Sequence, residues 1–144
     1  MYPAADMPIV MLSVKSDYDP KEHLALGRAL APLRDEGVLI VGTGLNYHNM
    51  RGFNRDSSTA DAEVFTQYLS EAVALEDARE RDERLLHWHL APRARIAHPR
   101  EDHLMPLLVA AGAAGGDKGR VLFAESIMKI PMTSYVFGEI DEPK

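Results

Sequence analysis

The stretch Gly37–Arg51, GVLIVGTGLNYHNMR, decides how the rest of the chain is interpreted. Its first part, Val38–Gly42, begins with four apolar residues in a row and predicts a buried strand. A loop containing a second glycine follows and leads to His48 and Asn49. Ligands of open α/β sheets bind just beyond the carboxyl ends of strands, so this loop predicts a functional site.

The residues before this loop predict a strand–helix–strand unit. Pro8–Val14, PIVMLSV, is apolar and partly β-branched, which favours a buried strand. Asp19 is placed to cap a helix over Glu22–Glu36, and Gly37 is placed to end it. Two strands joined through a helix pair in parallel with a right-handed crossover. We therefore expect an α/β fold, a mainly parallel sheet flanked by helices, in a single domain over residues 1–144.

The residues after the loop predict further helices and strands. A helix capped at residues 57–59 has an apolar face. The members of that face are Phe65, Tyr68, Leu69, Ala72 and Val73. The charged run at 76–84 predicts a solvated helical surface, and Asp102–Ala111 predicts another helix. Gly119–Ala124 and Met132–Phe137 predict strands, and the last residues predict a polar tail.

Composition excludes several classes of function. The net charge of −6 provides no basic surplus to neutralise nucleic-acid phosphates or an anionic membrane. The chain has no cysteine, so disulfides and thiolate metal sites are excluded. No apolar run approaches the roughly 20 residues of a membrane span, and the first residues do not have the pattern of a signal peptide. We expect a cytoplasmic protein with neither a nucleic-acid nor a membrane partner.

Histidines and carboxylates are the remaining candidates for chemistry. Gly42-Thr43-Gly44 lacks the further residues of nucleotide-binding loops, and no serine or cysteine stands in a nucleophile motif. His48 follows a predicted strand, and His103 ends the sequence HPREDH at the start of a predicted helix. Neutral imidazole is a good ligand of iron and zinc. We therefore predict that His48 and His103 meet at one metal site.

Other polar residues are weaker candidates with simpler alternatives. Asp102, with Glu101 as an alternative, is placed to orient His103 or His98. His98 is equally consistent with a turn, His103 with capping or packing, and Asn49 with turn chemistry or a substrate hydrogen bond. His23 is expected on the surface, and the pair His87 and His89 in packing or an interface.

Three stretches resemble the class III extradiol ring-cleavage dioxygenases. They are MYPAADMPIVMLSV at 1–14, HLALGRALAPLRDEGVLIVGTGLNYHNMR at 23–51 and HPREDHLMPLLVAAGAAG at 98–115. The most similar subgroup is the 4,5-DOPA dioxygenase type, which is related to the catalytic LigB subunit of protocatechuate 4,5-dioxygenase. The resemblance implies a partial version of the LigB-type fold, corresponding to its C-terminal half.

The resemblance also implies a chemistry. Such enzymes hold a mononuclear non-haem Fe(II), with Zn²⁺ as the alternative, and open the ring of a small catechol-type aromatic diol with O₂. His48 in YHN and His103 in DHL match positions at the metal centre, and His48 also matches a catalytic acid/base. His98 matches a less strict position. Asn49 and Arg51 are expected to bind substrate, within a contact region over Gly44–Phe53.

Family members are longer and carry further metal histidines in their N-terminal half. The resemblance therefore implies two kinds of partner, a second copy of the chain in a homo-oligomer or a complementing N-terminal half. Two alternatives to a dioxygenase remain open. One is a non-catalytic fragment or self-associating remnant of the family. The other is a zinc-dependent hydrolase in which Asp or Glu joins His48 and His103.

Overall fold

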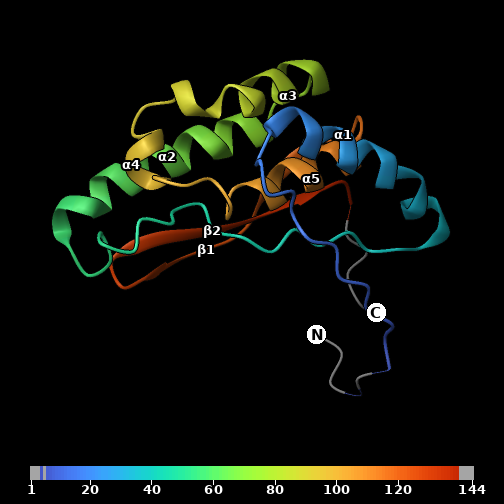
Figure 1. The fold of residues 1–144 in the computed structure, drawn as a ribbon, viewed down its shortest axis with the longest axis horizontal. Coiled ribbons are helices and arrows are strands. Elements are labelled where there is room, and N and C mark those ends of the chain that lie inside the picture. The colour runs from blue at the N-terminus through green and yellow to red at the C-terminus, as the bar shows by residue number, and fades with distance from the viewer. Residues whose placement is uncertain (1–3, 5, 140–144) are drawn as a thin grey trace.

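A computed structural model describes residue 4 and residues 6–139 of the chain. Helices lie over one side of a β-hairpin, and extended N-terminal segments run along the other side (Figure 1). The elements, in order, are α1 (Pro20–Leu30), η1 (Ala31–Glu36), α2 (Asp56–Val73), α3 (Ala78–Leu86), η2 (Trp88–Leu90), α4 (Ala94–Ala97), α5 (Met105–Ala114), β1 (Gly119–Ile127) and β2 (Ile130–Phe137). The expected α/β class is confirmed, and the expected polar tail lies outside the described residues.

The hairpin of β1 and β2 is antiparallel. Its register runs from Gly119 opposite Phe137 to Ile127 opposite Ile130. The two residues of the turn at 128–129 have positive φ values of 50° and 69°. Positive φ at both central residues matches the right-handed twist of the paired strands. Both strands predicted from the sequence are confirmed here, and both are longer than expected.

The mainly parallel sheet that we expected is not seen among the described residues. Pro8–Val14 and Val38–Gly42 are extended but have no strand pairing, and most of their apolar side chains are exposed. The prediction of two buried strands is therefore wrong for the described structure. A strand becomes buried only when neighbouring strands and packed layers surround it. Here Gly42 contacts α5, because it lies close to the Pro106 carbonyl. No described element covers the apolar side chains of Val38, Leu39 and Val41, which are exposed.

Helix α1 begins as predicted and continues into a 3₁₀ helix. The Asp19 carboxylate accepts the backbone N–H of Lys21 at 2.8 Å, which caps the helix. The expected single helix is divided, because the 3₁₀ segment η1 follows α1 around Pro32. His23 was expected on the surface, and this is wrong because it is buried. Its Nε2 accepts the Lys15 N–H at 3.1 Å and its Nδ1 bonds the Asp19 carbonyl at 2.7 Å, so backbone groups satisfy both ring nitrogens.

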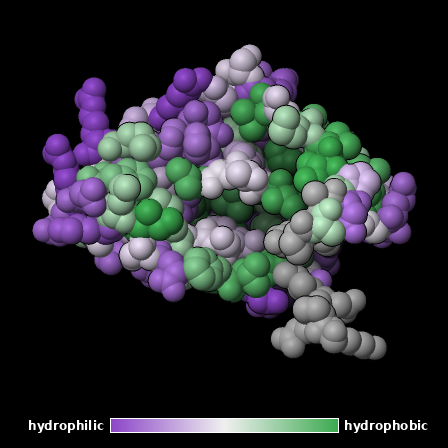
Figure 2. Space-filling model, turned by 90° about the horizontal axis from the view of Figure 1, so that it is seen from below, coloured by the Kyte–Doolittle hydropathy of each residue, from purple (hydrophilic) through white to green (hydrophobic). Residues whose placement is uncertain are grey.

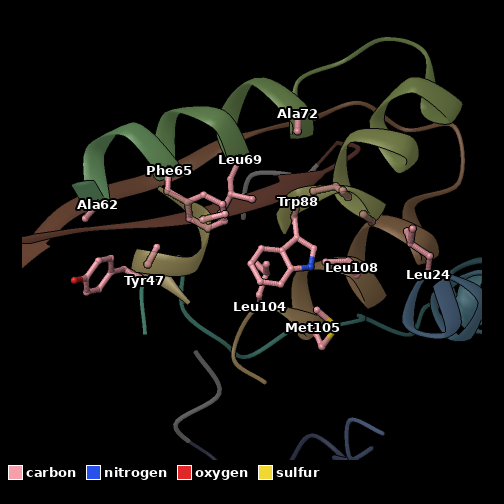
Figure 3. Packing of buried hydrophobic residues seen from close by; sticks show 14 of the residues in the cluster. Leu24, Tyr47, Ala62, Phe65, Leu69, Ala72, Trp88, Leu104, Met105 and Leu108 are labelled. Carbon is pink, nitrogen blue, oxygen red and sulfur yellow. The ribbon is translucent and has the colours of Figure 1, made fainter. Parts of the chain in front are cut away.

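Helix α2 supplies the centre of the hydrophobic core. Phe65, Leu69 and Ala72 are buried as predicted, and Trp88 and Leu108 pack towards them from η2 and α5 (Figure 3). The expected cap at residues 57–59 is wrong, because α2 begins at Asp56 without a side-chain cap. The Thr59 hydroxyl donates instead to the carbonyl of Lys129 in the hairpin turn, at 2.8 Å.

The charged run at 76–84 is only partly solvated. Arg81 is buried and donates hydrogen bonds to the carbonyls of Ala111, Gly115 and Asp117 at 3.0, 2.8 and 2.8 Å. It also contacts the Asp82 carboxylate at 3.0 Å. A guanidinium with five donors can satisfy several carbonyls at a helix end, so α3 is fixed to the C-terminal end of α5. The expectation of a fully solvated surface is wrong at these two residues.

Helices α1 and α5 touch through their backbones. A Cβ atom added to Gly27 would lie 2.1 Å from the Val109 carbonyl oxygen, and one added to Gly112 would lie 2.2 Å from the Leu24 carbonyl oxygen. No side chain larger than hydrogen fits between the helices at these points. The close approach fixes the position of α5, whose N-terminal end follows directly after His103.

We predict that Gly27→Ala destabilises the fold by about 2–3 kcal/mol, because the added methyl must push backbone atoms of α5 away. Urea unfolding followed by circular dichroism measures this difference. Gly116→Ala is the matched control, since nothing lies within 4 Å of its Cβ position and its φ is not positive. Equal stability of the two variants would contradict the proposed contact.

Candidate metal centre

Two segments far apart in the sequence bring His48 and His103 together. Their rings stack with centroids 3.6 Å apart and planes 20° from parallel. The His48 side chain is 22% exposed and that of His103 is 42% exposed, so both are open to solvent.

Backbone hydrogen bonds fix the loop that carries His48. The Leu45 N–H donates to the His103 carbonyl at 3.0 Å, and the His48 N–H donates to the Ala97 carbonyl at 2.9 Å. The side-chain amide of Asn49 donates to the Ile96 carbonyl at 2.9 Å. The loop is therefore held along the segment that runs from Ile96 to His103.

Asn46 anchors the same loop to the hairpin. Its buried amide donates to the Pro131 carbonyl at 2.8 Å and to the Thr66 hydroxyl, and its oxygen accepts the Thr133 N–H at 3.2 Å. Sequence reasoning did not single out this residue, because its partners come from α2 and β2, which lie far from it in the sequence. Its polar contacts connect α2, β2 and the loop that presents His48.

Asp102 joins the two histidines. Its Oδ1 lies 3.6 Å from His48 Nδ1, and its Oδ2 lies 4.0 Å from His103 Nε2. One ligand atom from each of the three residues lies within 4.8 Å of the other two. Oδ1 of Asp102 is buried and has no hydrogen-bond partner among the described residues. A buried carboxylate oxygen without a donor fits a bound cation, and two imidazoles with one carboxylate are a donor set of iron and zinc sites.

His98 lies next to this cluster and is fully buried. Its ring packs edge to face against Phe65 and Trp88, with centroid distances of 5.6 and 6.0 Å. Burial lowers the pKa of His98 to about 4, and backbone groups at Asn46 and Arg100 offset only part of this effect. His98 is therefore neutral at pH 7 and forms part of the wall behind the site.

A cavity of about 470 Å³ opens beside the His48 ring. It is lined by His48, Asn49, Met50, Arg51 and Pro99. The side-chain oxygen of Asn49 accepts the backbone N–H of Arg51 at 3.2 Å, and its amide nitrogen donates to Ile96. Both polar atoms of the Asn49 side chain are therefore already engaged. Arg51 is exposed and forms no ion pair among the described residues. The substrate contacts expected of Asn49 and Arg51 stay predictions.

The other candidates lie away from this site or are engaged elsewhere. Glu101 forms an ion pair with Arg95 at 2.7 Å, so Asp102 is the carboxylate that faces the histidines. His87 and His89 are exposed and do not belong to the cluster, and His23 is buried at the start of α1. Among the described helices, none combines the length and the apolar character that a bilayer span requires.

The chain matches the family model described as the catalytic LigB subunit of aromatic ring-opening dioxygenase over residues 1–138. It is 41% identical to the 4,5-DOPA dioxygenase extradiol of Beta vulgaris over an alignment 120 residues long, which covers 80% of this chain and 42% of that protein. It is 33% identical to dioxygenase tasH of Hapsidospora irregularis over an alignment 150 residues long, which covers 96% of this chain and 46% of that protein. The chain thus spans less than half the length of these relatives.

A solved structure has the same fold. The crystal structure of an uncharacterized protein, JW3007, from Escherichia coli K12 superposes with a TM-score of 0.82 at 29% identity. The match covers 94% of this chain and 57% of that one. A 4,5-DOPA dioxygenase extradiol of the same organism is 33% identical over an alignment 130 residues long, which covers 88% of this chain and 48% of that protein. The unit described above therefore occurs within longer chains.

We predict that His98 makes stability depend on pH. Because its pKa falls from about 6.5 in the unfolded chain to about 4 in the folded chain, the unfolded state binds the extra proton between these values. Stability is highest above pH 6.5 and falls as the pH decreases towards 4. From pH 7 to pH 4.5, His98 should lower the free energy of unfolding by about 2 kcal/mol.

The comparison is between wild type and His98→Phe, whose ring suits the aromatic surroundings. Urea unfolding at pH 7 and pH 4.5 should show a smaller loss of stability in His98→Phe than in wild type. His89→Phe, which replaces an exposed histidine, is the control and should keep the wild-type pH dependence. The same pH dependence in all three proteins would refute the role of burial at His98.

Proposed function

Because the chain belongs to the LigB family of aromatic ring-opening dioxygenases, we propose that it functions in extradiol cleavage of a catechol-type aromatic ring by O₂. The observation that carries this proposal is the convergence of His48, Asp102 and His103. These residues come from two loops, and the cavity beside His48 is open to a small molecule. The names of several relatives include 4,5-DOPA, an aromatic diol, which supports this class of substrate.

We propose His48, His103 and Asp102 as the residues of this chain that hold a mononuclear metal ion. Two imidazoles and one carboxylate are the donor set of non-haem Fe(II) oxygenases, so Fe(II) is the proposed metal and Zn²⁺ the alternative. When bound, Fe(II) supplies a centre at which a diol and O₂ are held next to each other and the diol loses its protons more readily. Net negative charge on Asp102 offsets part of the cation's charge.

The chain itself would orient the substrate and move a proton. His48 has two proposed roles that exclude each other at any one time, because a ring nitrogen bound to the metal has no lone pair for a proton. While its ring is not coordinated, His48 lines the cavity within reach of a hydroxyl group of a bound diol and can accept its proton. The Asp102 oxygen 3.6 Å from His48 Nδ1 would stabilise the imidazolium that results. Arg51 at the rim of the cavity offers a guanidinium to an anionic substituent on the ring.

The loop contacts give this arrangement its rigidity. Hydrogen bonds from Leu45, His48 and Asn49 to the opposite segment keep the imidazole in place before substrate arrives. Groups that are already oriented lower the entropy lost on reaching the transition state. The neutral ring of His98 is buried beside the cluster, where it packs against Phe65 and Trp88.

We predict that His48→Ala lowers ring-opening turnover by at least about 100-fold, the range expected for loss of a proton acceptor. The chain is loaded with Fe(II) without oxygen, then mixed with DOPA and O₂, and the yellow ring-opened product is followed by absorbance. His89→Ala is the control and should retain the wild-type rate, because His89 is exposed and is not part of the cluster. Equal activity of His48→Ala and wild type would refute the role of His48.

We also predict that Asp102→Asn weakens metal binding by at least about tenfold, because a neutral amide is a poorer ligand than a carboxylate. Isothermal titration calorimetry with Fe(II) or Zn²⁺ in the absence of oxygen measures the affinity. Asp61→Asn is a control at an acidic residue that pairs with Arg93 outside the cluster. Unchanged affinity in Asp102→Asn would show that this carboxylate is not a ligand.

The same experiments distinguish the alternative functions. A zinc-dependent hydrolase would need Zn²⁺ and would act without O₂, and the three clustered residues would be equally suitable for it. A non-catalytic member would bind metal weakly and form no product with either ion. Oxygen-dependent ring opening that is lost in His48→Ala is the result that supports the dioxygenase.

A further inference from the structure

Exposed apolar residues gather in three stretches of the chain, which we call the open face: residues 7–12, 38–41 and 121–123. Ile9, Val10 and Met11 are 84, 94 and 92% exposed, so side chains on both sides of this extended segment lack cover. In the other two stretches, Leu39 is 66% exposed and Phe123 is 56% exposed. The view from below shows hydrophobic side chains on the side of the molecule opposite the helices (Figure 2).

The composition of the open face is unusual for a solvated surface. Residues 7–14, MPIVMLSV, and 38–44, VLIVGTG, contain no charged side chain. Edges that natural proteins leave in water are normally protected by charges, bulges or a covering element. Exposed apolar residues without neighbouring charges mark a place where another polypeptide can pack.

The backbone of the open face also has free hydrogen-bonding groups. Among the described residues, no backbone hydrogen bond joins residues 8–14 to another strand. Within the described residues, β1 pairs with β2 along one edge, and its other edge has no partner strand. Extended backbone with unpaired groups can accept further strands. The surface is therefore suited to strand addition together with apolar packing.

Longer relatives offer a candidate for the polypeptide that covers the open face. The curated relatives extend well beyond the matched region, which is 42% of the Beta vulgaris protein and 46% of the Hapsidospora irregularis protein. The superposed Escherichia coli structure also has residues beyond the 57% that match. In those proteins the same unit lies in one chain with additional polypeptide, which is available to pack on the corresponding surface.

We propose that the open face is the docking surface for the polypeptide that corresponds to the unmatched part of a LigB-family chain. This polypeptide would add strands to residues 8–14 and 38–42 and an apolar layer over Leu39 and Phe123. The proposal depends on the family and on the exposed surface, and it does not depend on catalysis. A second copy of this chain is the competing occupant.

The test joins this chain with a defined partner. The full chain is co-expressed with the part of the Beta vulgaris 4,5-DOPA dioxygenase extradiol that lies outside the matched 120 residues. We expect a 1:1 complex by light scattering. Amide exchange at residues 9–12 and 39–41 should slow by at least about tenfold relative to the chain alone, because these groups become paired.

Two variants make the result specific. Val10→Lys combined with Leu39→Lys places charges on the open face and should abolish the complex, because burial of an unpaired charge is unfavourable. Leu90→Lys is the matched control: Leu90 is 73% exposed but lies on η2 outside the open face, so the complex should persist. Circular dichroism establishes that each variant is folded.

Two outcomes would overturn the proposal. The first is the absence of a complex on co-expression, or a complex that leaves the amides of residues 9–12 and 39–41 as unprotected as before. The second is a homodimer of the chain alone that protects these amides and is disrupted by the two lysines, which would identify a second copy as the occupant. Metal binding and turnover are not part of this test, so its failure leaves the proposed function untouched.

Discussion

The structure depends on contacts at backbone distance along helix α5. On one side, Gly27 and Gly112 allow α1 and α5 to touch without intervening side chains. At its N-terminal end, a Cβ atom on Gly44 would lie 2.1 Å from the His103 carbonyl oxygen. Such contacts leave little room for adjustment, because packed interiors transmit displacement. The position of α5 therefore sets the position of His103 and of the loop that presents His48.

The electrostatics of the candidate site follow from this geometry. Two imidazoles lie face to face, and a carboxylate oxygen of Asp102 is buried nearby without a donor. An unsatisfied buried polar group costs about 1–3 kcal/mol, more when it is charged. A proton shared with His48, or a cation held by all three residues, would offset that cost. The ring of His98 adds no positive charge to the His48–Asp102–His103 cluster at pH 7, because burial lowers the pKa of His98 to about 4.

Local patterns in the sequence predicted local structure well. The Asp19 cap, the apolar face of α2 around Phe65 and Leu69, and the hairpin strands were predicted because neighbouring residues determine them. Tertiary partners determine the features that were missed. His23 is buried because two backbone groups bind its ring, and nothing in its local sequence reveals this. Arg81 likewise lies in a charged run, yet carbonyl groups at the end of α5 enclose it.

The segment from Val38 to His48 links the candidate site to the open face. Its first residues, including Leu39 and Val41, are exposed, whereas Gly42 and Gly44 lie against α5 and His48 reaches the cluster with Asp102. Apolar cover over the first part would restrict the motion of the entire segment, since its other end is already held by hydrogen bonds. Docking at the open face and order at the imidazole cluster are therefore expected to be coupled through this single stretch of extended backbone.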